Sequence, residues 1–166
     1  MNFIIYSCCR ESDRAVGEDP IRVEWSDTVP DIGETISLGS EQCWFKVKVT
    51  PYKSLKPSID VYLVHVNKTL STPFKWDYEG YEHETIHIEL SAVGEPILGF
   101  AFNVLGEAPQ VGEQLLNYKR TAHPTLMKET PNSWVIDRYD EFLPEVNAPY
   151  KAIYLAYCKM TSLVAA

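Results

Sequence analysis

The residues with the clearest potential for chemistry are His83, Glu84 and His87, which form the pattern H-E-x-x-H. On an α-helix, two histidines four positions apart share one face and can bind a single zinc ion, while the glutamate acts as general base. One hypothesis is therefore a zinc-dependent hydrolase, with His83 and His87 as metal ligands and Glu84 as the catalytic base.

The sequence around this motif favours a β-strand instead. Apolar residues at positions 86, 88 and 90 alternate with polar residues at 87, 89 and 91, which is the period of a strand. Residues four apart in a strand are separated by roughly 13 Å, too far for one zinc ion with bonds of about 2 Å. We therefore expect no metal at His83 and His87, and the zinc hydrolase is kept as an alternative.

Other catalytic patterns are missing from the sequence. It contains no serine elbow of the form G-x-S-x-G and no glycine-rich phosphate loop. The cysteines Cys8, Cys9, Cys43 and Cys158 form no C-x-x-C pair, so we expect reduced thiols rather than a metal or redox site. The sequence predicts a protein that is not an enzyme and that uses no cofactor.

Composition limits the classes of partner. The chain has 166 residues, a net charge of −8 and a pI near 5.0, so a general affinity for nucleic acid or for an anionic membrane is not expected. No apolar run approaches the ~20 residues of a transmembrane helix. We expect a soluble, cytoplasmic protein that binds another protein or itself.

One local region departs from this acidic character. Trp44, Lys46 and Lys48 are predicted to share one strand face, with Tyr52 beyond them. Basic residues interleaved with aromatic ones can bind single-stranded nucleic acid on a small β-barrel. This is a second alternative function, weighed against the simpler explanation that lysines on an edge strand prevent aggregation.

An internal repeat organises the chain. Segments of the first half recur in the same order in the second half: Ala15–Ile21 with Ala92–Ile97, Pro30–Ile36 with Pro109–Leu115, Trp44 and Tyr52 with Trp134 and Tyr139, and Val61–Val66 with Ile153–Cys158. Recurrence in a fixed order indicates a tandem duplication. We divide the chain into a first repeat at 1–70, a connector at 71–82 and a second repeat at 83–166 with longer loops. In this alignment Phe3 lies opposite His87.

Each repeat has the pattern of short β-strands bounded by Pro, Gly, Asp and Ser. The recurring Pro-x-Ile/Val-Gly-Glu step predicts a tight turn, in which glycine permits a positive φ and the glutamates Glu34 and Glu113 cap the backbone or face water. The predicted fold class is mostly β: a tandem duplication of a small antiparallel β-barrel or sandwich domain, SH3-like or OB-like by analogy only.

The connector is rich in aromatic and acidic residues, unlike a flexible linker. Its Trp76 and Tyr78 are candidates for a binding surface in a cleft between the repeats, because aromatic side chains anchor interfaces. Tyr62 and Tyr154, at matching positions of the two repeats, and Trp44 complete this predicted surface. The function predicted from the sequence is a non-enzymatic binding or structural module that acts through protein contacts or self-association.

Overall fold

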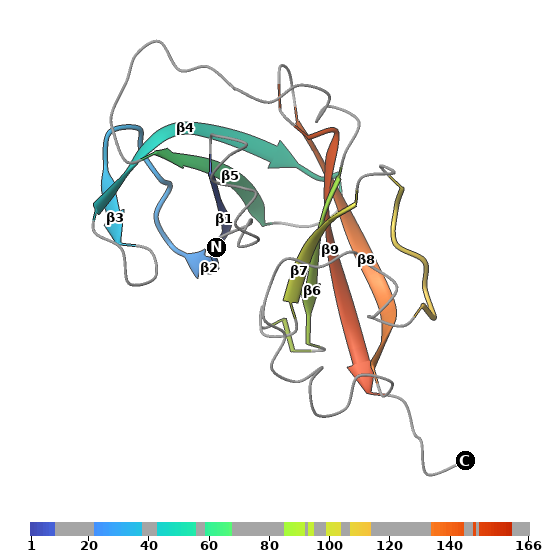
Figure 1. Cartoon of the computed structure of the whole chain (residues 1–166). Coiled ribbons are helices and arrows are strands. Elements are labelled where there is room, and N and C mark those ends of the chain that lie inside the picture. Colours follow the sequence, from blue (N-terminus) through green and yellow to red (C-terminus); the bar gives the residue numbers. More distant parts are fainter. Residues whose placement is uncertain are drawn as a thin grey trace.

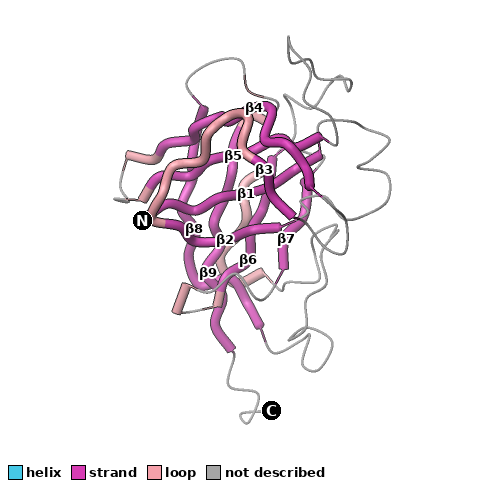
Figure 2. The backbone as a smooth tube through the Cα atoms, turned by 90° about the vertical axis from the view of Figure 1, so that its left-hand side faces the viewer, coloured by secondary structure: helices cyan, strands magenta, loops and turns pink. Residues whose placement is uncertain are grey.

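The computed structural model describes residues 1–8, 22–37, 43–55, 59–67, 85–91, 93–94, 99–103, 107–113, 134–144, 148 and 150–160. These residues form nine strands and no helix (Figures 1 and 2). The strands are β1 (Asn2–Cys8), β2 (Arg22–Ser26), β3 (Thr35–Ser37), β4 (Cys43–Lys53), β5 (Asp60–Asn67), β6 (Thr85–Leu90), β7 (Gly99–Asn103), β8 (Trp134–Pro144) and β9 (Ala152–Met160).

The predicted mostly-β class is confirmed for the described residues. The strand expected around 86–90 is present as β6, so the alternation of apolar and polar residues gave the correct element there. The described part of the chain contains no helix that is long and apolar enough to cross a membrane. The connector at 71–82, with Trp76 and Tyr78, lies outside the described residues, as do His83 and Glu84.

The strands form one sheet in the order β2-β1-β5-β4-β8-β9-β6-β7, with β3 paired to β4. Strands β1 to β5 make the first half and β6 to β9 the second half, and Figure 1 shows β4 and β8 meeting where the halves join. The β1–β5 and β6–β9 pairs are parallel. The predicted antiparallel pairing holds for the other strand pairs, whereas the central pair of each half is parallel.

The pairings of the first half recur in the second. β1 pairs with β2 and β5 as β6 pairs with β7 and β9, and the β4–β5 hairpin corresponds to β8–β9. Both hairpins carry a β-bulge at the matching place, between Lys46 and Lys48 and between Ile136 and Arg138. A bulge adds one residue to one strand and so changes which face the following side chains occupy.

The same turn precedes both hairpins. Gly33 has a φ of 94° and Gly112 a φ of 89°, a region that glycine adopts without steric cost. The Gly33 amide donates to the carbonyl of Lys46 and the Gly112 amide to that of Ile136, each at 2.8 Å. A carboxylate oxygen of Glu34 accepts from the Asp31 amide at 2.8 Å, so the predicted role of this glutamate as a turn cap is confirmed.

The strand pairings correct two matches of the predicted repeat. Val61 lies opposite Phe3 in the first half and Ile153 lies opposite Ile86 in the second, so the counterpart of Phe3 is Ile86. The predicted match of Phe3 with His87 is one residue out, which exchanges the two faces of the strand. In the same way Tyr52 corresponds to Phe142 and not to Tyr139.

Both halves contribute to one hydrophobic core. The buried side chains of this shared core are Phe3, Ile5, Tyr52, Val61 and Leu63 from the first half, and Ile86, Ile88, Leu90, Phe142, Tyr150, Ile153 and Leu155 from the second. The face of each half that bears these residues is called its shared face, and the opposite face its far face. Burial of this many large apolar side chains is the main force that holds the halves together.

In the described part of the chain, two side-chain hydrogen bonds between the halves accompany this core, in addition to the β4–β8 strand pairing. The Tyr52 hydroxyl donates to the carbonyl of Tyr150 at 2.9 Å in a buried position. The indole Nε1 of Trp25 donates to the carbonyl of Gly94, also at 2.9 Å. Each bond satisfies the polar atom of a large ring that is otherwise packed among apolar side chains.

Candidate binding face

The far face of the first half is apolar at its centre. Its buried residues are Ile4, Tyr6, Trp44, Val64 and Val66, with Ile36, Val49 and Tyr62 packed against them. Trp44 and Tyr62, both predicted to bind a partner, are therefore part of a small hydrophobic cluster. Tyr62 lies on the far face because its neighbours Val61 and Leu63 point into the shared core.

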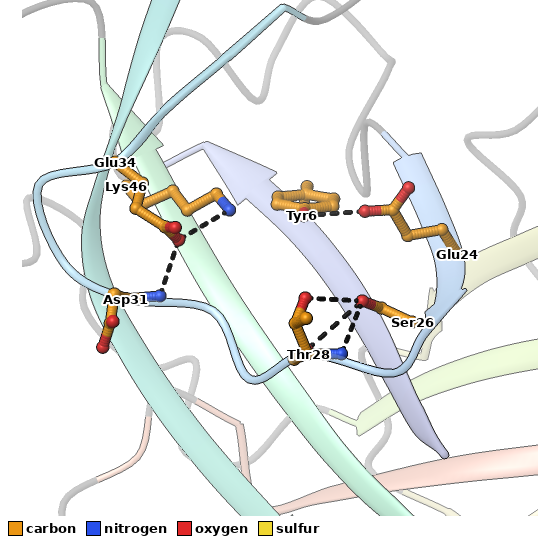
Figure 3. Close-up of polar contacts among 7 residues, drawn as sticks. All are labelled: Tyr6, Glu24, Ser26, Thr28, Asp31, Glu34 and Lys46. Atoms are coloured by element: carbon orange, nitrogen blue, oxygen red, sulfur yellow. Dashed lines mark hydrogen bonds and ion pairs between the residues drawn. The ribbon is translucent and has the colours of Figure 1, made fainter.

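Charged side chains surround this cluster and pair with one another. The Lys46 Nζ lies 3.0 Å from a carboxylate oxygen of Glu34 and 5.8 Å from the centre of the Tyr6 ring. The Tyr6 hydroxyl donates to Glu24 at 2.9 Å, and Figure 3 shows these side chains facing each other over β1. Lys46 thus interacts with a carboxylate and an aromatic ring of its own half.

The same face of the second half is polar. In the register of the strand pairs, Ile4 is replaced by His87, Tyr6 by Glu89, Val49 by Tyr139 and Pro51 by Glu141, whereas Tyr62 is matched by Tyr154. His87 and Glu89 are buried. Burial of ionisable side chains costs free energy unless they are hydrogen-bonded. The buried polar side chains of the second half therefore require a hydrogen-bond network that the apolar first half does not need.

His87 is held at the centre of this network. Its Nε2 lies 2.9 Å from the carbonyl oxygen of Glu107 and 3.0 Å from the Thr85 hydroxyl. A carbonyl oxygen can only accept, so Nε2 carries the hydrogen and the ring orientation is defined. The imidazole also contacts Tyr154 edge-to-face, with the ring centres 5.3 Å apart.

Tyr154 connects His87 to the edge of the face. Its hydroxyl donates to a carboxylate oxygen of Glu141 at 2.9 Å, and its ring meets that of Tyr139 edge-to-face at 5.7 Å. Burial, followed by the bond to Glu141, raises the pKa of the Tyr154 hydroxyl, which therefore stays protonated and donates. Only 4% of Tyr154 is exposed against 37% of Tyr139, so Tyr139 and the exposed Glu141 form the accessible part of the face.

The zinc hypothesis gains no support from the described residues. His87 lies in a strand, whereas the zinc motif requires a helix. In the described part of the chain no three His, Cys, Asp or Glu side chains are placed to hold a metal ion. His83 and Glu84 lie outside the described residues, so the motif as a whole stays a hypothesis.

The predicted nucleic-acid face is divided by the bulge in β4. Lys46 pairs with Val66 and lies on the far face, whereas Lys48 pairs with His65 and lies on the shared face. Tyr52 is fully buried in the shared core. The prediction that Trp44, Lys46 and Lys48 share one strand face is therefore wrong, because the extra residue reverses the alternation.

A basic residue follows each bulge on the shared face. The Arg138 guanidinium lies 3.9 Å from the centre of the Tyr157 ring, and Lys48 is the strand partner of His65 at the matching position. Burial, with a smaller contribution from the Lys48 charge, lowers the pKa of His65 to about 3. His65 is thus neutral at physiological pH and acts as a buried ring rather than as a charge.

Sequence reasoning identified His87 and Tyr154 but did not identify their neighbours Glu89, Tyr139 and Glu141. A comparison of the two halves position by position could have identified these residues. It fails when the alignment of the two halves is wrong by one residue, because every side chain is then assigned to the opposite face. Comparisons with protein-family models, with curated proteins and with solved structures find no match for this chain.

Proposed function

We propose that the protein is a non-enzymatic binding module, built by tandem duplication, that binds a protein partner or a second copy of itself through the far face of the second half. The contact residues are Tyr139 and Glu141, supported by Tyr154. The predicted site between the repeats stays a prediction, since its Trp76 and Tyr78 lie outside the described residues. The far face is preferred here because the described apolar side chains of both halves pack together in the shared core.

The observation that carries this proposal is the contrast between the two far faces. The scaffold is the same, yet the first half places apolar residues where the second half places His87, Glu89, Tyr139 and Glu141. A buried polar network costs stability relative to an apolar cluster and orients the residues at its edge. Tyrosine is among the residues that are enriched at protein interfaces and that anchor them, and Tyr139 is exposed on this face.

Site-specific photo-crosslinking tests the proposal. A photoreactive phenylalanine analogue would replace Tyr139 in the far face of the second half or, as matched control, Val49 at the same position of the first half. We expect crosslinked adducts from position 139 in cells and few from position 49. Adducts of twice the chain mass identify self-association, and other masses identify a different protein. Equal yields from both positions, or no adduct at position 139, would contradict the proposal.

A further inference from the structure

We propose that the far face of the second half recognises an organic cation carried by a polypeptide, namely the ammonium group of lysine or the guanidinium group of arginine. The cation would lie between the Tyr139 ring and the Glu141 carboxylate. This inference rests on the binding function proposed above and specifies the chemistry of the group that is bound.

The spacing of the two residues suits one cation. Tyr139 and Glu141 are two positions apart on β8 and point to the same face, so their backbone positions are separated by about 6.7 Å. The pairing of Tyr139 with Ala156 and of Glu141 with Tyr154 places both on the far face. We place the cation where it lies within the ~6 Å of the Tyr139 ring centre that a cation–π contact requires. From there it would also reach the Glu141 carboxylate within the ~4 Å that an ion pair requires.

Neighbouring side chains fix the orientation of Tyr139 and Glu141. The Tyr154 hydroxyl, 2.9 Å from a carboxylate oxygen of Glu141, limits the rotation of the carboxylate, and the Tyr154 ring packs against the Tyr139 ring. Tyr154 is in turn packed against His87, whose Nε2 is bound to the carbonyl of Glu107. A site whose groups are already oriented loses less conformational entropy when a ligand binds.

The first half shows the same chemistry at another position of its far face. There Lys46 lies 3.0 Å from Glu34 and 5.8 Å from the Tyr6 ring centre, so a cation is bound by a carboxylate and a tyrosine on the far face. The counterpart of Lys46 in the second half is Ile136. Among the described residues no lysine or arginine forms an ion pair with Glu141, and the chain has a net charge of −8. In the proposal, a partner supplies the complementary cation.

Peptide binding tests this inference. The probes are a fluorescent Gly/Ser peptide with two lysines, the same peptide with both lysines acetylated, and a third with two glutamates, followed by anisotropy at low salt. We expect the lysine peptide to bind and the other two not to bind. Glu141→Gln and Tyr139→Leu should each weaken binding about fivefold, the size of one exposed ion pair or cation–π contact.

Two variants separate a site from general attraction to an acidic protein. Asp31→Asn removes one exposed carboxylate from the first half and should leave binding unchanged. Tyr139→Phe keeps the aromatic ring and should bind like the wild type. Equal binding of the acetylated peptide, or an equal loss in Asp31→Asn and Glu141→Gln, would overturn the inference.

The proposed function and the cation inference fail in different ways. If position 139 yields crosslinked protein while the lysine peptide does not bind, the partner is not recognised through a cation and the binding function stands. If position 139 yields no adduct, the proposed function itself fails.

Discussion

Lys53 of β4 lies directly opposite Leu143 of β8 in the antiparallel pair that joins the two halves. Leu143 also follows Lys53 by 90 positions, the offset between Tyr52 and its counterpart Phe142. Counterparts that face each other across an antiparallel pair mark a local two-fold axis. The halves therefore meet as two subunits of a symmetric dimer do, which supports the proposal of a tandem duplication.

This contact predicts a disulfide. Opposite residues of an antiparallel pair have their Cα atoms about 4.5–5.5 Å apart, within the range that a disulfide spans. Lys53→Cys combined with Leu143→Cys should therefore oxidise readily to an intramolecular bridge, detected by peptide mass spectrometry. Leu55→Cys with Leu143→Cys is the control and should bridge poorly, because Leu55 is exposed and lies beyond the end of β4. Equal bridging in both pairs would show that the register is wrong.

Tyr52→Phe should destabilise the whole protein by about 1–2 kcal/mol, because the buried carbonyl of Tyr150 loses its hydrogen bond. Phenylalanine is the residue at the matching position of the second half, so its ring fits this type of site. Urea unfolding followed by fluorescence and by circular dichroism measures the change. Since both halves share one core, the two signals should shift together; two separate transitions would contradict a shared core.

Gly33→Ala and Gly112→Ala should each cost about 1–2 kcal/mol, since an L-residue at these positive φ values is strained. An added Cβ would meet no atom within 4 Å at either position, so backbone strain is the whole effect. The two costs should be equal within error because the turns make the same hydrogen bonds to Lys46 and Ile136. Thermal or urea unfolding tests this, and a cost below 0.5 kcal/mol would exclude the strained turn.

His65 should make the protein less stable in mild acid. Its pKa is lowered to about 3 in the folded protein and returns to about 6.5 on unfolding, so the unfolded chain binds the extra proton between these values. Stability is therefore lost as the pH falls from 6.5 towards 3, by about 2 kcal/mol between pH 7 and pH 5. His65→Gln should remove this share of the pH dependence in urea unfolding at the two pH values. An unchanged pH dependence would show that His65 is not buried in the neutral form.

Local patterns in the sequence predicted the strands and the turns well. The alternation around Ile86 and Ile88 gave β6, and the Pro-x-Ile/Val-Gly-Glu step gave turns with glycine at positive φ. The division of Lys46 and Lys48 between two faces could not be foreseen, because a bulge depends on the partner strand. The parallel pairs β1–β5 and β6–β9 likewise depend on contacts between residues far apart in the chain.

The candidate face was found only in part. His87 and Tyr154 attracted attention through the H-E-x-x-H motif and the repeat, and the structure brings their rings into contact. Glu141 belongs to no sequence motif. Its importance comes from the hydrogen bond that it accepts from the Tyr154 hydroxyl, and from the contrast with the proline at the matching position of the first half. Such a relation appears only when the register of the two halves is known.

The most direct test of the binding face is a map of amide chemical shifts during titration with the two-lysine peptide. We predict that the shifted amides cluster around residues 139–141 of β8 and 154 of β9, and that the far face of the first half, where Lys46 already pairs with Glu34, is unaffected. Shifts centred on Glu24 and Glu34, or spread evenly over the acidic surface, would contradict the assignment of the binding face to the second half.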